Sequence, residues 1–248
     1  MPRIANNLIT DDHAYTYLSN KLIHIGHRNR LKETINFLDK NINYRLSSIM
    51  DIGGGSGFIG DRIAEKFKNI SSQRVYDIIH PENEKNSFRR WYKPKLPTKY
   101  NTFNINSDNL ISKNIKQNTL IICSETIEHV GDPIISSKML LDTIKDSSAE
   151  LYISYPIETG LIGFLKFATK FLIGRYKKKR TIKSLIFQFL WLIGIKKVFR
   201  EKNDLYHDHD GFNDKLLTKF ILKYCKNKLI KYKLFLGLSS VHIYCKVN

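Results

Sequence analysis

Residues 48–67, SIMDIGGGSGFIGDRIAEKF, join an apolar run to a glycine-rich turn and then to a helix-like stretch. After the turn, apolar residues recur along one side, at Phe58, Ile59 and Ile63. A strand that ends in glycines and opens a helix presents backbone amides to any ligand at the helix N-terminus. Glycine suits such a turn because it adopts positive φ and lets a ligand touch the main chain. The segment therefore predicts an α/β unit with a ligand site where its first strand, 47–52, ends.

The rest of the chain repeats this alternation of short apolar runs and helix-like patterns. We expect further strands at 74–79, 100–105, 119–124 and 150–156, and helices over 11–46, 133–145 and 211–225. The run 119–124 is almost wholly apolar, as in a strand covered on both faces. Residues 229–237 and 239–247 predict a closing antiparallel pair. Strands alternating with helices indicate a mostly parallel sheet with helices on both faces.

The composition fits one globular domain with an unusual charge. Its 248 residues, 42 % of them hydrophobic, allow a sizeable core and exclude a disordered chain. The formal net charge of +18 has two explanations that composition leaves open. One is the lysine-rich bias of an AT-rich genome, and the other is an anionic partner such as nucleic acid or an anionic membrane surface.

Cysteine usage and the N-terminus bear on the compartment. Cys123, Cys225 and Cys245 lie far apart in the sequence and form neither a C-x-x-C pair nor an even-numbered disulfide framework. We therefore expect a reducing, cytoplasmic environment without structural zinc. No signal-peptide pattern opens the sequence, and no apolar stretch approaches the ~20 residues of a membrane span. The expected location is cytoplasmic, peripheral at the inner face of the membrane.

The glycine loop fits two cofactor motifs. Residues 55–60 match G-x-G-x-x-G, the dinucleotide fingerprint, while residues 51–57 match D-x-G-x-G-x-G, which resembles the loop that holds S-adenosylmethionine. Both loops work with an acidic residue about 20 positions further on that binds ribose hydroxyls. Asp77 stands at that place. The loop and Asp77 thus predict a cofactor that contains adenosine and leave the two motifs open.

The stretch after the fourth strand separates the two cofactors. Residues 120–133, LIICSETIEHVGDP, resemble the signature SE-x-x-EH-V-x-D-P of class I S-adenosylmethionine-dependent methyltransferases. With the loop, Asp77 and the SYP at 154–156, this resemblance covers 47–156 in the family order. It implies a Rossmann-like fold: a mostly parallel seven-stranded sheet with an antiparallel last strand and helices on both faces.

Two further segments resemble methyltransferases of type 11/23 from bacterial surface-polysaccharide gene clusters. Residues 155–167 resemble their P-I-E-x-G segment. Residues 205–217 resemble their H-x-GFD segment, with Asn213 in place of the acid. This resemblance implies a role in polysaccharide biosynthesis.

The family resemblance also implies roles for individual residues, with S-adenosyl-L-methionine as cofactor. Asp51 would orient the ammonium group, Asp77 would accept from the ribose hydroxyls, and Asp108 would face the adenine. Ser124 and Glu125 would lie near the sulfonium. The expected cofactor-binding residues are Asp51, Gly53, Gly54, Gly55, Gly57, Asp77, Asp108 and Ser124.

A hydroxyl acceptor needs a base, usually a histidine or a carboxylate, to remove its proton. We expect the catalytic residues to be His209, His129 and Glu125. The alternative for His207 and His209 is that they cap the following helix or solvate a loop. For Glu128, the alternative is a helix-dipole contact at a helix start.

A metal-assisted mechanism is the second hypothesis. Glu125, Glu128, His129 and His209 resemble the residues with which small-RNA 2′-O-methyltransferases hold a divalent cation. Two carboxylates and two imidazoles can bind Mg²⁺ or Mn²⁺. The net positive charge would suit RNA.

Residues 160–202 hold the densest positive charge. They include twelve basic residues and one acid, Glu201, so they contribute 12 − 1 = +11. Lys166 and Lys170, spaced i,i+4, predict a polar stripe on a helix with a broad apolar face. Two such helices around a lysine-rich hinge suit an anionic membrane surface, met through 161–200. Ubiquinone-biosynthesis O-methyltransferases are similar in the placing of an amphipathic insert; a lid, a homodimer interface or RNA binding are the alternatives.

These observations give one expected organisation. It comprises an N-terminal helical cap (1–46), an S-adenosylmethionine-binding core (47–156), a basic amphipathic helical insert (157–204) and the C-terminal part of the same domain (205–248). The expected activity is O-methylation of a sugar of a glycan or lipid-linked glycan at the membrane surface. A metal-assisted RNA 2′-O-methyltransferase and a non-catalytic cofactor-binding or membrane-associated partner are the alternatives.

Overall fold

The structure is a computed structural model, and a defined part of the chain is described. It comprises residues 14–21, 24–42, 44–78, 92–105, 115, 118–145, 147, 149–172, 186, 189–193, 209, 211–225, 227–235 and 238–246. Within these, side chains at 170–172 and 227–239 are not considered.

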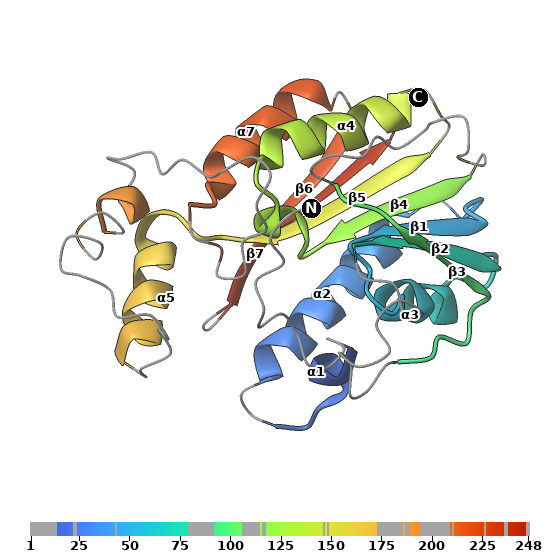
Figure 1. Cartoon of the computed structure of the whole chain (residues 1–248), viewed down its shortest axis with the longest axis horizontal. Helices are drawn as coiled ribbons and strands as arrows, with labels where there is room; N and C mark the ends of the chain where they lie inside the picture. The colour runs from blue at the N-terminus through green and yellow to red at the C-terminus, as the bar shows by residue number, and fades with distance from the viewer. Residues whose placement is uncertain are drawn as a thin grey trace.

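A single mixed sheet forms the centre of the molecule (Figure 1). Its strands are β1 (Ser48–Ile52), β2 (Ser72–Asp77), β3 (Thr98–Thr102), β4 (Thr119–Ser124), β5 (Glu150–Pro156), β6 (Asn227–Phe235) and β7 (Leu238–Lys246). They lie in the order β3-β2-β1-β4-β5-β7-β6. The first five are parallel, and β7 runs antiparallel to both β5 and β6. The expected antiparallel last strand and closing pair are confirmed.

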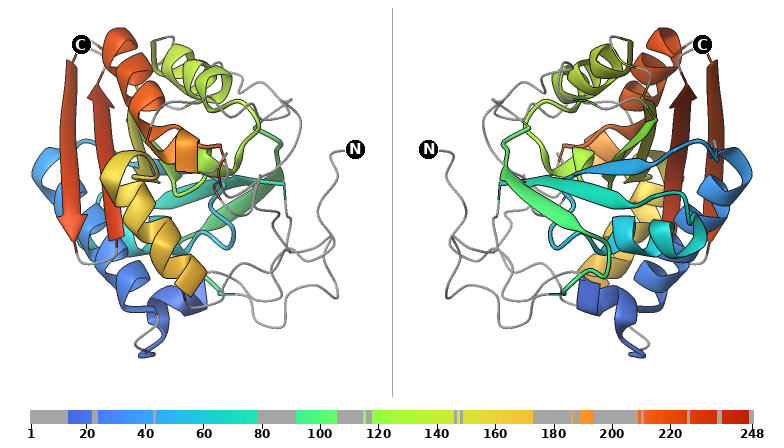
Figure 2. Two further views of the ribbon diagram at one scale, coloured as in Figure 1. Left: turned by 90° about the vertical axis from the view of Figure 1, so that its left-hand side faces the viewer. Right: turned by 90° about the vertical axis from the view of Figure 1, so that its right-hand side faces the viewer.

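Helices cover both faces of this sheet, as expected. They are α1 (Ala14–Leu18), α2 (Ile25–Asn41), α3 (Phe58–Lys66), α4 (Pro133–Lys145), α5 (Gly160–Leu172), α7 (Asp214–Tyr224) and the 3-10 turn η3 (Ile127–His129). Figure 2 shows α4 and α7 together on one face and α2 and α3 on the other. Helix α5 extends beyond the sheet, past the end of β5 (Figure 1).

Strand β4 shows how the sequence builds the two layers. Leu120 and Ile122 belong to the core on the α2 side, with Phe37 of α2 and Ile63 of α3. Ile121 and Cys123 belong to the core on the α4 and α7 side. Because successive side chains of a strand point to opposite faces, an apolar run must be covered on both sides. The wholly apolar pattern at 119–124 predicted this correctly.

The predicted helix over 11–46 is divided in the structure into α1 and α2. Residues 19–21 between them are not helical. The Arg28 guanidinium, on the first turns of α2, donates to the carbonyl oxygens of Ser19 and Lys21 and so closes the corner. The apolar spacing predicted the helical residues but not the corner between the two helices. The corner depends on hydrogen bonds from the Arg28 side chain to main-chain oxygens, which leave no apolar pattern.

The expectation that the cysteines are unpaired is wrong for two of them. Cys225 and Cys245 form a disulfide with a Cα–Cα distance of 6.2 Å, while Cys123 is free and buried. Cys225 follows the last turn of α7, and Cys245 lies near the end of β7. The two residues meet only because α7 packs against the sheet, so spacing along the chain could not reveal them.

Among the described helices, none has the length and apolar character needed to cross a bilayer.

Candidate active site

The candidate site lies where the parallel strands end. The strand order places β1 beside β4, although β2 and β3 come between them in the sequence. Open α/β sheets bind ligands at such a switch point, outside the carboxyl ends of the strands. The loops after β1, β4 and β5 and the end of β2 lie at this edge, so residues far apart in the sequence gather there.

The loop after β1 needs its glycines for two physical reasons. Gly53, Gly55 and Gly57 have φ of 69°, 55° and 81°, in the left-handed region that disfavours residues with a Cβ. At Gly53 a Cβ would also lie 2.2 Å from the Thr126 methyl group. At Gly54 it would lie 2.4 Å from the Asp51 carboxyl carbon. The loop is therefore packed directly against its own strand and against the loop after β4.

Asp77 lies against the glycine loop. Its Oδ2 accepts a hydrogen bond from the Gly55 amide at 2.8 Å, and the Gly53 amide donates to the Tyr76 carbonyl at 2.7 Å. The end of β2 and the loop after β1 are thus joined by one hydrogen bond to a side chain and one between main-chain atoms. This places a carboxylate next to three left-handed glycines, and its role as a ribose-binding acid stays a prediction.

Asp51 is the buried charge of this edge. Its side chain is almost fully buried, and its Oδ2 has no hydrogen-bond partner among the described residues. Burial, and then the nearby Asp77 carboxylate, raise the pKa of Asp51 to about 7. A carboxylate buried in this way is stabilised when a cation binds beside it, because the cation compensates for the hydration that the carboxylate has lost.

The N-terminal helices cover this edge with two side chains that the sequence analysis did not name. The Tyr17 ring of α1 stacks on Phe58, the first residue of α3, with ring centroids 5.6 Å apart. Burial raises the pKa of Tyr17. Arg30 of α2 forms an ion pair with Glu125. No motif marks Tyr17 or Arg30, so only the cap as a whole could be predicted.

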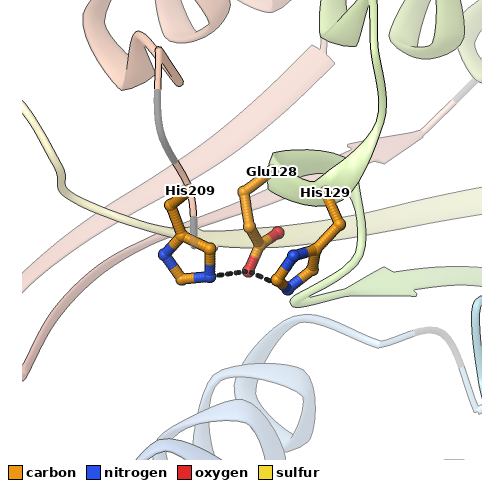
Figure 3. A group of neighbouring side chains, drawn as sticks. All are labelled: Glu128, His129 and His209. Carbon is orange, nitrogen blue, oxygen red and sulfur yellow. Dashed lines mark ion pairs between the residues drawn. The ribbon is translucent and has the colours of Figure 1, made fainter. Parts of the chain in front are cut away.

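Glu128 and His129 of the loop after β4 face His209, which precedes α7, so that a carboxylate and two imidazoles meet (Figure 3). Glu128 is fully buried within η3, and its Oε1 lies 3.9 Å from Nε2 of His129 and 3.9 Å from Nε2 of His209. The two rings are 4.7 Å apart, centroid to centroid. Burial raises the pKa of Glu128 and lowers that of His209. Each shift favours the neutral form of its group.

His209 is fixed from its other side by a residue that the motif analysis quoted without giving it a role. Its Nδ1 is 3.0 Å from Oε1 of Glu158, which belongs to the turn between β5 and α5. His209 itself has φ of 54°, a conformation uncommon for a residue other than glycine. A buried carboxylate at Nδ1 leaves Nε2 as the atom that faces Glu128.

The turn that carries Glu158 is held by Asp214 at the start of α7. Oδ1 of Asp214 accepts hydrogen bonds from the amides of Glu158 and Thr159 at 3.0 and 2.8 Å, and from the Thr159 hydroxyl at 2.7 Å. Asn213, in the place where the related segment has an acid, caps α7 by accepting from the Leu216 amide at 2.9 Å. The acid next to it therefore joins the segment at 158–159 to the segment at 209–214.

Comparison with solved structures identifies the fold. Magnesium protoporphyrin IX methyltransferase from Synechocystis PCC 6803, solved with bound SAH, superposes with a TM-score of 0.52 at 11 % identity, over 94 % of this chain and 92 % of that chain. The small RNA methyltransferase HEN1 gives 0.52 at 13 % identity, over 90 % of this chain and 25 % of that one. This chain has the class I methyltransferase fold. No protein-family model matches the chain, and no curated protein matches it in sequence.

Within this methyltransferase fold, the predicted site residues divide into two groups. Asp51, the glycines and Asp77 gather at the ends of β1 and β2. Glu128, His129 and His209 gather beyond β4. Glu125 has φ of 53° and is paired with Arg30, outside the group that could hold a metal ion.

Four further residues come from the expected sites or the quoted motifs: Ser124, Asp108, His207 and Asp132. The Ser124 hydroxyl lies 2.9 Å from that of Ser154 on β5, so it bridges two strands. Asp108 and His207 lie outside the described residues. Asp132 caps α4 by accepting from the amides of Ile134 and Ile135, which explains the aspartate in the motif before Pro133 as a helix start.

Proposed function

We propose that this chain is an S-adenosylmethionine-dependent methyltransferase that methylates a hydroxyl group of a sugar. The observation that carries the proposal is the pairing of two sites at one edge of the sheet. One is a glycine loop with two acids, Asp51 and Asp77. The other is a histidine pair with a buried carboxylate, Glu128. The first suits a nucleoside that carries an ammonium group, and the second suits removal of a proton.

The residues of the first site fit S-adenosylmethionine. The buried Oδ2 of Asp51 would accept the ammonium group of the methionine part, and Asp77 would accept from the ribose hydroxyls after releasing the Gly55 amide. Thr126 and Asp51 leave no room for a side chain at 53 and 54, so a ligand there would touch the main chain. Tyr17 would close the pocket from the cap.

Bound S-adenosylmethionine supplies a methyl group on a sulfonium, a leaving group that needs no further activation. The chain must then align an acceptor oxygen with that carbon and take up the proton of the hydroxyl group. His209 is suited to the second task because burial lowers its pKa and keeps Nε2 neutral. On transfer, the new C–O bond would form as the carbon–sulfur bond of the donor breaks and S-adenosylhomocysteine leaves, and the hydroxyl proton would move to Nε2 of His209. The charged ring would lower the pKa of Glu128, so its carboxylate would stabilise the imidazolium.

A sugar acceptor is favoured by the two segments that resemble polysaccharide-cluster methyltransferases. Those segments, 155–167 and 205–217, meet in the structure through the contact of Glu158 with His209 and through the hydrogen bonds of Asp214. Residues that share a resemblance and also share a contact are consistent with one acceptor site. The acceptor class is therefore proposed to be a glycan or lipid-linked glycan.

Cofactor binding is the first test. Isothermal titration with S-adenosylmethionine and with S-adenosylhomocysteine should give one site per chain in the wild type and no detectable binding in Asp77→Ala. The matched control Asp132→Ala changes an acid that caps α4 away from the loop and should bind both ligands normally. Absence of binding to the wild type would refute the proposal.

Methyl transfer is the second test. The protein and methyl-labelled donor are incubated with cell-envelope glycans and, separately, with total RNA. Label recovered as methyl ethers of sugars after acid hydrolysis supports the proposal, while label in RNA supports the second hypothesis. Cofactor binding without transfer to either fraction would favour a non-catalytic partner.

The metal-assisted alternative retains three of its four residues. Atoms of Glu128, His129 and His209 that could bind a metal ion all lie within 4.8 Å of one another. A carboxylate with two imidazoles is a ligand set that leaves open positions for hydroxyl oxygens. Transfer that survives EDTA would exclude this role, and transfer restored by Mg²⁺ or Mn²⁺ after EDTA would establish it.

We also propose that the insert lies on an anionic membrane surface, which would bring a lipid-linked acceptor to the site. Five apolar side chains of α5 and of the described residues 186 and 189–193 are exposed, namely Leu161, Leu165, Ile186, Phe189 and Ile193. The Phe164 and Phe189 rings, 5.5 Å apart, join the two segments. Trp191, between Phe189 and Ile193, is only 3 % exposed and packs inside, so it is not part of this surface.

Vesicle sedimentation tests this surface. The wild type should sediment with phosphatidylglycerol vesicles, and Leu161→Asp with Leu165→Asp should reduce the bound fraction strongly. Leu216→Asp is the matched control, because Leu216 is 51 % exposed on α7. Equal binding by all three proteins would refute the membrane surface.

A further inference from the structure

Helix α5 exposes apolar side chains and covers a charged one, the reverse of a helix whose outer face meets water. Leu161 is 72 % exposed and Leu165 55 %, whereas the Lys166 side chain is only 12 % exposed. The sequence predicted Lys166 as part of a polar stripe on this helix, and in the structure its side chain is largely covered. A helix that keeps a lysine inside and leucines outside must be held in that rotation by a specific contact, because free rotation would reverse it.

Lys166 makes that contact with the turn before its own helix. Its Nζ donates to the Ile157 carbonyl at 2.7 Å and lies 3.5 Å from Oε1 of Glu158. Oε1 of Glu158 is also the oxygen at 3.0 Å from Nδ1 of His209. One carboxylate oxygen is thus shared between the helix that carries the exposed leucines and the proposed base.

The backbone around this oxygen is also held by hydrogen bonds and close packing. Asp214 holds the amides of Glu158 and Thr159. On the other side, a Cβ at Gly163 would lie 1.9 Å from the Glu158 carbonyl oxygen, so the first turns of α5 press directly on this turn. A rotation or displacement of α5 cannot leave Glu158 unchanged, because no free space separates them.

We propose that Lys166 and Glu158 are positioning residues that couple the seating of α5 on its partner surface to the orientation of His209. The inference rests on the proposed function, since it takes His209 as the base and the outer face of α5 as the membrane-facing side. In the seated state Glu158 holds Nδ1 and directs Nε2 toward Glu128. When Lys166 leaves, the Glu158 carboxylate loses that contact and the His209 ring gains freedom.

The reactivity of the His209 ring reports on this coupling without any acceptor. The protein, in EDTA, is treated with diethyl pyrocarbonate, and modification of His209 is followed by peptide mass spectrometry relative to His27 on α2. We expect Lys166→Gln and Glu158→Gln each to raise the relative His209 rate about three- to tenfold, as for loss of one contact in a coupled network. Lys166→Arg should restore the wild-type rate.

Lys219→Gln, which removes an exposed lysine from α7, is the matched control and should change nothing. A general loss of structure would raise the His27 rate too and lower the melting temperature, so the ratio of the two rates isolates positioning. If Lys166→Gln leaves the ratio at the wild-type value, Lys166 does not position His209 and the inference is overturned.

Vesicles test the coupling itself. Phosphatidylglycerol vesicles should change the relative His209 rate of the wild type at least about threefold, as expected for coupled sites. The same vesicles should not change that rate in Lys166→Gln, which keeps the exposed leucines and should still sediment. Vesicles that bind the wild type without changing its His209 rate would overturn the inference. Titration with S-adenosylhomocysteine on the same samples tests the proposed function separately, because it depends on Asp51 and Asp77 and not on α5.

Discussion

The two halves of the candidate site are built in different ways. The donor half lies on one continuous stretch, from β1 through α3 to Asp77, and its shape comes from backbone conformation and a lack of space for side chains. The acceptor half uses η3, the turn after β5, α5 and the start of α7, joined by contacts between side chains. The donor half should therefore be sensitive to added volume, and the acceptor half to lost polar groups.

The largest expected effect falls on the acceptor half. Replacing His209 with glutamine removes the base, and methyl transfer to the glycan fraction should fall about 10²- to 10⁴-fold. The dissociation constant for S-adenosylmethionine should stay within about twofold, because the ring contacts residues beyond β4 and not the glycine loop. His27→Gln on α2 is the control. A parallel loss of cofactor binding would show that the two halves are not separate.

The next effect concerns pH and the donor half. Because the pKa of Asp51 is about 7, the free protein holds this proton up to neutrality. A ligand ammonium group needs the ionised form, so affinity for S-adenosylhomocysteine should rise about tenfold per pH unit below 7 and level off above it. Titrations from pH 5 to 8 measure this, and Asp51→Asn should bind weakly with no such slope.

The same group gives a stability prediction of definite sign. The pKa of Asp51 is raised on folding, from 3.8 to about 7. Between these values the folded state binds more protons than the unfolded state, so the free energy of unfolding should fall as pH rises through this range. Above pH 7, the free energy of unfolding of Asp51→Asn should exceed that of the wild type by up to about 4 kcal/mol. The variant should therefore unfold at a higher denaturant concentration. Equal midpoints would place Asp51 in a more hydrated site.

Added volume in the glycine loop should have an effect of similar or smaller size. Gly53→Ala combines a left-handed φ with a Cβ that overlaps Thr126, so unfolding should become easier by about 2–4 kcal/mol. Gly160→Ala is a close control, because its φ of 68° nearly equals the 69° of Gly53 and a Cβ there meets only the flexible end of Lys215. That variant should lose only about 1 kcal/mol. Equal losses would mean that backbone conformation alone explains Gly53.

The smallest expected effect is at the helix start in the acceptor half. Asn213→Ala removes the cap that accepts from the Leu216 amide, which should cost about 1 kcal/mol. Asn213→Asp keeps an acceptor and should retain the stability. Chemical denaturation of both variants gives the comparison, and a neutral Asn213→Ala would show that Asp214 alone fixes this end of α7.

The difference between the halves also explains what the sequence predicted. Strands and helices of the core were identified because each element carries its own periodic pattern, as at 119–124 and 133–145. The glycine loop and Asp77 were identified because a local backbone requirement is visible in residue type. The contacts of Arg30 and Lys166 and the disulfide between Cys225 and Cys245 were missed, because a contact between different segments leaves no local pattern. Glu158 lay within a quoted motif, which was the one signal available for it.

The dense packing between residue 53 and Thr126 limits which pairs of residues natural variants can carry at these two positions. Position 53 and position 126 lie on the loops after different strands and share one small volume, so a side chain at 53 needs a residue smaller than threonine at 126. Among natural variants of this sequence, a change from glycine at 53 should therefore occur together with a smaller residue at 126.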